Sequence, residues 1–216
     1  MSGWGAQARG SPAGVGPDDS ARRRSALHAS YTVATHRPGW KRLIQRGFPP
    51  ISTRGSRVLV VGSLPGPESL RRGEYYAQPR NSFWRIVSDL FGTGPLDDYP
   101  ARVAAIERHG LALWDVCAAA ERAGALDSAI RRASVEVNDF EGFFRRHRAI
   151  ERVYCNGQTA AALYRRRVLP TLNSPASDLP VIALPSTSPA NAAIAYPGKL
   201  AAWAVVRPAV GAVARG

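Results

Sequence analysis

Apolar residues gather in short runs separated by longer amphipathic segments, and this pattern starts only after about residue 42. Four of the runs are short and mostly apolar, as buried parallel strands are. The longer segments between them favour helices. The predicted strands are 57–62, 111–117, 152–155 and 180–184, and the predicted helices are 82–91, 100–109, 158–168 and 200–210.

Two polar pairs mark the starts of helices. Asn138 and Asp139 open a further helix, and Glu141 stands three residues after Asn138, as in a capping box. Asn156 and Gly157 form the turn from the third strand into the helix that follows.

Strands and helices alternate along the chain, which predicts an α/β fold. We expect a three-layer αβα sandwich with a central four-stranded parallel sheet. In such sheets the ligand lies at the carboxyl ends of the strands. Three loops follow these ends, after Gly62, Trp114 and Leu184.

The chain is strongly basic, with a formal net charge of +13 and a pI of about 10.9. Such a charge indicates a polyanionic partner, usually nucleic acid. The alternative is compositional drift, because only Lys41 and Lys199 are lysines among 29 basic residues. Residues 1–42 lack hydrophobic periodicity and predict a disordered basic arm before a folded domain at 43–216. The run Arg22–Arg24 in this arm suits either phosphate contact or a solvated tail.

The cysteine count excludes a thiolate cluster, which needs four ligands. Cys117 and Cys155 are the only cysteines, and their apolar surroundings predict buried free thiols in a reducing compartment. The N-terminus has no apolar signal segment, and no apolar run is long enough to span a bilayer. We therefore expect a cytoplasmic monomer that needs no metal and no other cofactor.

The loop after the first strand, Gly62–Leu70, is rich in glycine, proline and serine. It has neither the Lys-Ser/Thr of a Walker A loop nor the Gly-x-Ser-x-Gly of a nucleophile elbow. It either aims backbone N–H groups into a pocket or forms an ordinary tight turn. A serine hydrolase is disfavoured, because all the histidines lie away from the strand-end loops. These histidines are His28, His36, His109 and His147.

The segment Tyr75–Trp84 places aromatic rings, an amide and an arginine within ten residues. Tyr76 is either a stacking platform for a base or a half-buried core residue. Asn81 either hydrogen-bonds a base or a water, or caps the helix that begins beside it.

The loop Leu184–Asn191 carries three hydroxyl side chains. Hydroxyls and backbone N–H groups here suit a phosphate. Alternatively, Ser188 is a helix N-cap with Pro189 at the first helical position. Asp115 is the carboxylate of the second strand, and it either reaches the pocket or caps the following turn.

Six motifs together resemble the uracil-DNA glycosylase superfamily, most closely its hypoxanthine-DNA (deoxyinosine) glycosylase branch, family six. The resemblance covers about residues 47–205. It implies a DNA glycosylase of base excision repair, associated with the nucleoid, that binds DNA containing a damaged base and removes hypoxanthine or uracil. The motifs are Gly62–Leu70, Tyr75–Trp84, Leu113–Asp115, Gly124–Ile130, Asn156–Gly157 and Leu184–Asn191.

The resemblance also implies roles for individual residues. Tyr76 falls on the phenylalanine that stacks against the flipped base in mismatch-specific uracil glycosylases. Ser63 replaces the asparagine that positions the attacking water in those enzymes, which argues against strong uracil activity. The branch relies instead on the asparagine that is Asn81 here.

We therefore expect Asn81 and Ser63 to be catalytic. The candidate base-binding residues are Gly62, Leu64, Tyr76 and Asp115. The candidate DNA-binding residues are Pro65, Gly66, Pro185, Ser186, Thr187, Ser188, Pro189 and Asn191, with Ile194 as the wedge that fills the gap left by the flipped base.

Two alternatives remain open at this point. One is a mismatch-specific uracil/thymine-DNA glycosylase, and the other is a non-catalytic DNA-binding module of the same fold. A lyase activity needs an amine nucleophile. Lys41 lies outside the motifs and Lys199 lies past the last loop, so we expect a monofunctional enzyme that leaves an abasic site.

Overall fold

The structure is a computed structural model that describes residues 44–206. The predicted arm, with Arg22–Arg24, lies outside the described residues, as does the part of the last predicted helix beyond residue 206. Cys117 and Cys155 are both buried free thiols. In the described part of the chain, no helix is long and apolar enough to cross a membrane.

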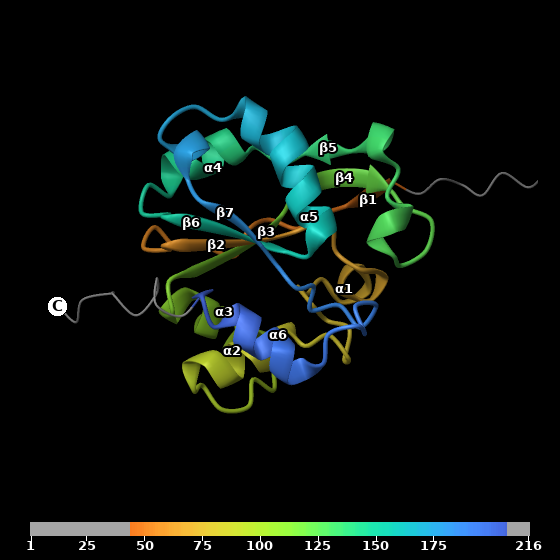
Figure 1. Ribbon diagram of the computed structural model, residues 1–216, viewed down its shortest axis with the longest axis vertical. Coiled ribbons are helices and arrows are strands. Elements are labelled where there is room, and N and C mark those ends of the chain that lie inside the picture. The colour runs from red at the N-terminus through yellow and green to blue at the C-terminus, as the bar shows by residue number, and fades with distance from the viewer. Residues whose placement is uncertain (1–43, 207–216) are drawn as a thin grey trace, which may run out of the picture. The chain divides into compact units, whose positions relative to one another are not determined.

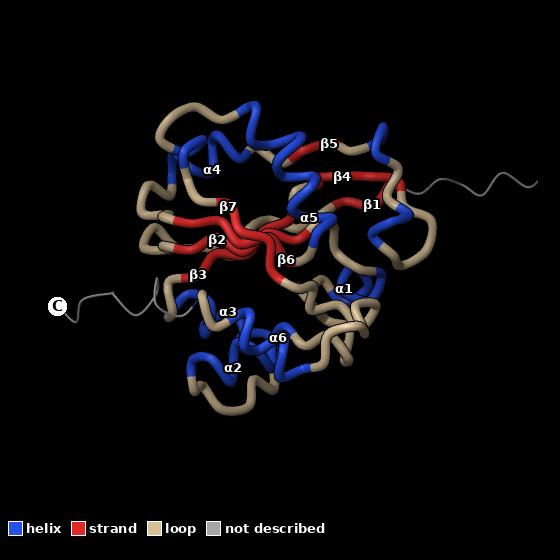
Figure 2. The backbone as a smooth tube through the Cα atoms, viewed as in Figure 1, coloured by secondary structure: helices blue, strands red, loops and turns tan. Residues whose placement is uncertain are grey.

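The central element is a sheet of four parallel strands in the order β3-β2-β6-β7 (Figures 1 and 2). All five residues of β2 are buried, because strands flank it on both sides and helices cover both faces. This explains why its sequence is continuously apolar rather than alternating. The strands are Val58–Gly62 (β2), Leu111–Asp115 (β3), Arg152–Asn156 (β6) and Val181–Leu184 (β7).

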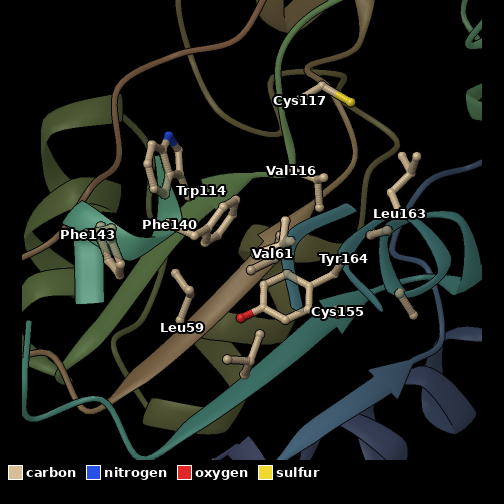
Figure 3. Packing of buried hydrophobic residues seen from close by; sticks show 14 of the residues in the cluster. Leu59, Val61, Trp114, Val116, Cys117, Phe140, Phe143, Cys155, Leu163 and Tyr164 are labelled. Carbon is tan, nitrogen blue, oxygen red and sulfur yellow. The ribbon is translucent and has the colours of Figure 1, made fainter. Parts of the chain in front are cut away.

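Helices cover both faces of this sheet, α2, α3 and α6 on one face and α4 and α5 on the other (Figure 1). Val58 and Val60 of β2 pack with the first group, whereas Leu59 and Val61 pack with the second (Figure 3). This is the three-layer αβα sandwich, so the predicted fold class is confirmed. The helices are Phe83–Phe91 (α2), Tyr99–Arg108 (α3), Phe140–Arg146 (α4), Gln158–Leu163 (α5) and Tyr196–Trp203 (α6).

A second sheet of three short antiparallel strands, in the order β1-β4-β5, corrects one prediction. The single strand expected over 111–117 is wrong, because the apolar run bends at Val116 and its second half pairs with β1. At the bend, the N–H groups of Val116 and Cys117 donate to the carbonyl oxygens of Gly62 and Ser63, at 2.9 and 3.0 Å. The strands are Ile44–Arg46 (β1), Cys117–Glu121 (β4) and Glu136–Val137 (β5).

The capping box predicted at the start of α4 is also wrong. Asp139 caps this helix, because its Oδ1 accepts a hydrogen bond from the N–H of Gly142 at 2.8 Å. Asn138 instead donates from its side-chain amide to the carbonyl oxygen of Asp115 at 2.8 Å. It thereby ties the start of α4 to the end of β3.

Three other helical segments differ from the prediction. The first loop contains a short helix, α1 (Pro67–Arg72), with proline in its first turn. The helix expected over 158–168 leaves α-geometry after Leu163 and ends in a π-helical turn, Tyr164–Val168. The last helix begins at Tyr196 rather than residue 200. Single 3₁₀ turns lie at Asp127–Ala129, Arg132–Ser134, Leu169–Thr171 and Ala176–Asp178.

Candidate active site

A cavity of about 750 Å³ opens where the four parallel strands end, beside α1. All but two of the predicted site residues line it. Pro185 lies behind the wall, where its carbonyl oxygen accepts a hydrogen bond from Nε1 of Trp203 at 2.9 Å. Ile194 is 37 % exposed and also lies outside the lining. The lining residues that were predicted are Gly62, Ser63, Leu64, Pro65, Gly66, Tyr76, Asn81, Asp115, Ser186, Thr187, Ser188, Pro189 and Asn191.

Sequence reasoning missed one wall of the cavity. This wall is the connection between β4 and β5, which contributes Arg122 and the residues 125–128. The motif Gly124–Ile130 lies in this wall, so the motif was the one feature of the sequence that could have indicated it. No role was predicted for Asp127, because its partner Ser63 is far away in the sequence.

Tyr76 packs against the core and also faces the cavity, so its predicted stacking on a base stays a prediction. Its ring stacks on Phe83 with centroids 4.0 Å apart, and the residue also lines the cavity. Its φ angle of 54° is in the left-handed region, which is unusual for a bulky residue. The hydroxyl is buried beside the side chain of Asn156 and makes no hydrogen bond of good geometry within the described residues. Burial, followed by the nearby charge of Asp115, raises the pKa of Tyr76, and Asn156 opposes this shift.

Asn81 supports the start of α2 and lines the cavity, while its predicted hydrogen bond to a base or a water stays a prediction. Its Oδ1 accepts a hydrogen bond from the N–H of Phe83 at 3.0 Å and so caps α2. This bond fixes which end of the amide is oxygen. The Nδ2 group finds no acceptor within the described residues, and Asn81 lines the cavity. The side chain therefore has a hydrogen-bond donor available for a ligand.

Asp115 lies at the end of β3, only 4 % exposed. A Cβ added to Gly62 would lie 2.2 Å from Oδ1 of Asp115, so the carboxylate needs glycine at that position. Its Oδ2 is buried and has no partner within the described residues. Burial, together with the charge of Asp127, raises the pKa of Asp115 to about 7, against a smaller opposing effect of Arg122. A buried carboxyl with a free oxygen is typical of a ligand-binding group.

Ser63 is held by a carboxylate from the wall that sequence reasoning missed. Its Oγ donates to Oδ2 of Asp127 at 2.6 Å. Arg122, with its side chain fully buried, lies 3.7 Å from Oδ1 of Asp127. The same guanidinium donates to the carbonyl oxygens of Leu64 and Pro65. Arg122 therefore fixes both the first loop and the carboxylate that faces Ser63.

The third loop, Leu184–Asn191, is fixed by hydrogen bonds to the end of β6 and to the start of α2. Asn156, at the end of β6, donates to Oγ1 of Thr187 and accepts from its N–H, both at 2.9 Å. The carbonyl oxygen of Thr187 accepts from the N–H of Ser82 at 3.0 Å, which links this loop to α2. The loop therefore positions the start of α2, which Asn81 directly precedes.

The serine hydroxyls of this loop stabilise local turns. Oγ of Ser186 accepts from the N–H of Ser188, and Oγ of Ser188 accepts from the N–H of Ala190, each at 3.2 Å. The suggestion that Ser188 caps a helix is wrong, since α6 starts only at Tyr196. Both O–H groups retain a proton to donate, and both residues line the cavity.

No group of three metal-ligating side chains occurs among residues 44–206. Lys199 is 6 % exposed, and its Nζ lies 3.5 Å from the carbonyl oxygen of Ser188, outside the cavity lining. Burial lowers its pKa.

Comparison with known proteins identifies the family. The model of the uracil DNA glycosylase superfamily matches residues 49–207. A hypoxanthine DNA glycosylase of Methanosarcina acetivorans is 34 % identical over 138 residues, which are 60 % of this chain and 86 % of that protein. A hypoxanthine DNA glycosylase of Methanosarcina barkeri is 37 % identical over 97 residues, which are 44 % of this chain and 60 % of that protein.

One solved structure agrees with these relatives. It is a solution NMR structure, described as a candidate uracil DNA glycosylase from Methanosarcina acetivorans. It has a TM-score of 0.65 and 29 % identity, over 78 % of this chain and 99 % of that one. The resemblance predicted from six motifs is confirmed, and the chain belongs to the uracil-DNA glycosylase superfamily.

Proposed function

We propose that the chain is a monofunctional DNA glycosylase that hydrolyses the N-glycosidic bond of hypoxanthine in DNA, with uracil as a weaker substrate. The observation that carries this proposal is the convergence of polar atoms in one cavity. Oδ2 of Asp115 and the hydroxyl of Tyr76 are buried without a well-placed hydrogen-bond partner within the described residues, and Asn81, whose Oδ1 is bonded to Phe83, lines the same cavity. A cavity of about 750 Å³ is large enough for a base flipped out of the duplex.

The flipped base binds between the first and second loops. It stacks on Tyr76, whose ring is already supported by Phe83. Oδ2 of Asp115 accepts the N1–H of hypoxanthine, and the corresponding N3–H of uracil makes a similar contact. Gly62 and Leu64 complete the base-binding surface.

The first loop and the third loop, Leu184–Asn191, hold the DNA backbone on either side of the flipped nucleotide. Ser186 and Ser188 donate their O–H groups to phosphate oxygens. The other residues assigned to this surface are Pro65, Gly66, Pro185, Thr187, Pro189 and Asn191. We further propose that the protein acts as a monomer on nucleoid DNA.

Cleavage proceeds through a sugar with oxocarbenium character, so the enzyme must stabilise the departing base and supply a water. Nδ2 of Asn81 donates to the leaving base, because Oδ1 is already used by Phe83. A lyase step would need an amine at the sugar. Lys199 is buried outside the lining and Lys41 lies outside the motifs, so we expect hydrolysis to leave an intact abasic site.

The test of this function uses labelled duplexes that carry one inosine, uracil, xanthine or ethenoadenine. We expect strand scission at inosine after alkali treatment and none without alkali. Scission mainly at uracil would indicate a mismatch-specific uracil enzyme of the same fold. Binding without scission of any duplex would indicate a non-catalytic module, and borohydride trapping of the protein on DNA would contradict monofunctional hydrolysis.

We propose Leu126 as a second candidate, besides Ile194, for the wedge that replaces the flipped base. Leu126 is 54 % exposed and lies in the cavity wall, whereas Ile194 is outside the lining. We expect Leu126→Ala to slow excision of inosine from a duplex about tenfold, with a much smaller effect on a single strand, which has no stack to refill. Ile194→Ala is the matched comparison. A larger duplex-specific loss in Ile194→Ala than in Leu126→Ala would return the wedge to Ile194.

A further inference from the structure

The proposed reaction still lacks a group that can accept a proton from the attacking water. The amide of Asn81 has no basic site, so it orients ligands but takes no proton. The cavity is lined by three carboxylates, those of Glu68, Asp115 and Asp127. The structure distinguishes them by their partners.

Two of the three carboxylates already have other partners, either in the protein or in the proposed complex with the base. Glu68 accepts hydrogen bonds from Arg71 and Arg72, its neighbours on α1, at 2.6 to 2.9 Å. Asp115 is 4 % exposed at the end of β3, where its free oxygen is assigned to the base. Only Asp127 combines partial exposure with a direct bond to a residue of the first loop.

The contact between Asp127 and Ser63 leaves two oxygen atoms that can each accept a hydrogen bond from one water. Ser63 has a single proton, and it donates that proton to Oδ2 of Asp127 at 2.6 Å. Oγ of Ser63 is therefore left as an acceptor, and Asp127, whose side chain is 40 % exposed, offers a second acceptor beside it. A water that donates one hydrogen to each would have its lone pair directed away from both.

Arg122 keeps this pair in place. Its guanidinium is fully buried and is fixed by the carbonyl oxygens of Leu64 and Pro65. It lies 3.7 Å from Oδ1 of Asp127. A fixed positive charge at that distance favours the ionised carboxylate.

We propose that Asp127, together with Ser63, holds the attacking water and accepts its proton, which makes Asp127 a catalytic residue. This inference rests on the proposed glycosylase function. The bond between C1′ and the base nitrogen breaks, and its electron pair leaves with the base. The water oxygen forms the new bond to C1′, one water proton passes to Asp127, and the base takes a proton from solvent.

The charged and titratable groups that interact with Asp127 are Arg122, Asp115, Tyr76 and Cys117. Burial raises the pKa of Asp127, while the hydrogen bond from Ser63 and the charge of Arg122 oppose that shift. An ionised general base gives a rate that rises with pH through its pKa and then levels off. Because Asp115 titrates in the same cavity, its contribution to the pH dependence of the rate must be separated from that of Asp127.

The test is single-turnover excision of inosine as a function of pH, with binding to uncleaved and abasic-analogue DNA measured beside it. We expect Asp127→Asn to lower the rate about 100-fold, to remove the part of the acid-side rise that persists in Asp115→Asn, and to change the DNA affinity less than threefold. Glu68→Gln, at another carboxylate of the same cavity, is expected to keep the wild-type rate and profile. In Asp115→Asn, the rise that belongs to Asp127 is expected to persist.

Ser63→Ala removes one hydroxyl and provides a second, less disruptive variant. Its loss and that of Asp127→Asn are expected to be non-additive in the double variant, because both residues hold one water. The inference is overturned if folded Asp127→Asn keeps the wild-type rate, or loses rate with an unchanged pH profile, or adds independently to Ser63→Ala. If the wild-type protein excises no base, the proposed glycosylase function fails. If the wild type is active and only the results for Asp127→Asn differ from those expected, the role proposed for Asp127 fails alone.

Discussion

Replacing Asn81 with aspartate is expected to lower base excision about 10²- to 10³-fold while the free energy of unfolding stays within about 0.5 kcal/mol of the wild type. The reason lies in the two ends of the side chain. Oδ1 of Asn81 caps α2 through the N–H of Phe83 at 3.0 Å, and an aspartate oxygen caps a helix equally well. Aspartate cannot, however, donate a hydrogen bond from the position of Nδ2.

Asn81→Ala is the comparison that separates these two functions. Alanine removes both the cap and the donor, so it should lose activity to a similar extent and also about 1 kcal/mol of stability. The measurements are single-turnover excision of inosine and urea unfolding for both variants. If Asn81→Asp were as active as the wild type, Asn81 would be a helix cap without a role in catalysis.

The fold could be predicted largely because β2 is buried on both faces. Val58, Leu59, Val60 and Val61 are each no more than 1 % exposed, and such burial demands a continuous apolar run that is visible in the sequence. The same property caused the error in the second strand. Apolar residues continue through the bend at Val116, and nothing in a continuous apolar run marks where one sheet ends and the other begins.

The short strands β1 and β5 were not predicted, and the start of the last helix was predicted too late, for a different reason. β1 and β5 have only three and two residues, too few to show any periodicity. The last helix was expected at residue 200, although Pro197 already stands in its first turn. Proline at a helix start was the available signal there.

The site shows the limit of sequence reasoning most clearly at Ser63. The loop that contains it was predicted, because its glycines and prolines follow a strand. Its partner Asp127 is 64 positions away in a segment without periodic character, and Arg122 pairs with Asp127 from the end of another sheet. Contacts of this kind depend on how the two sheets lie relative to each other. A local sequence pattern does not predict that arrangement.

Asp115→Asn is expected to stabilise the protein by several kcal/mol at pH 8 and to leave its stability almost unchanged near pH 4. Burial raises the pKa of Asp115 in the folded state to about 7, from an ordinary value of 3.8. The folded state therefore binds this proton more tightly than the unfolded state, so stability falls as the pH rises from about 4 to about 7 and is constant above. A shift of about three units corresponds to about 4 kcal/mol.

Urea unfolding between pH 4.5 and pH 8 measures this effect directly. The wild type should lose stability across the range, Asp115→Asn should lack that component, and Asp97→Asn, at an exposed aspartate, should follow the wild type. A wild-type stability that does not fall between pH 5 and pH 7 would show that Asp115 is ionised without cost. Substitutions that stabilise a protein commonly lower its activity when they fall in a destabilised active site. We therefore expect the more stable Asp115→Asn to excise inosine about tenfold more slowly, because a neutral amide oxygen accepts the N1–H less strongly than a carboxylate does.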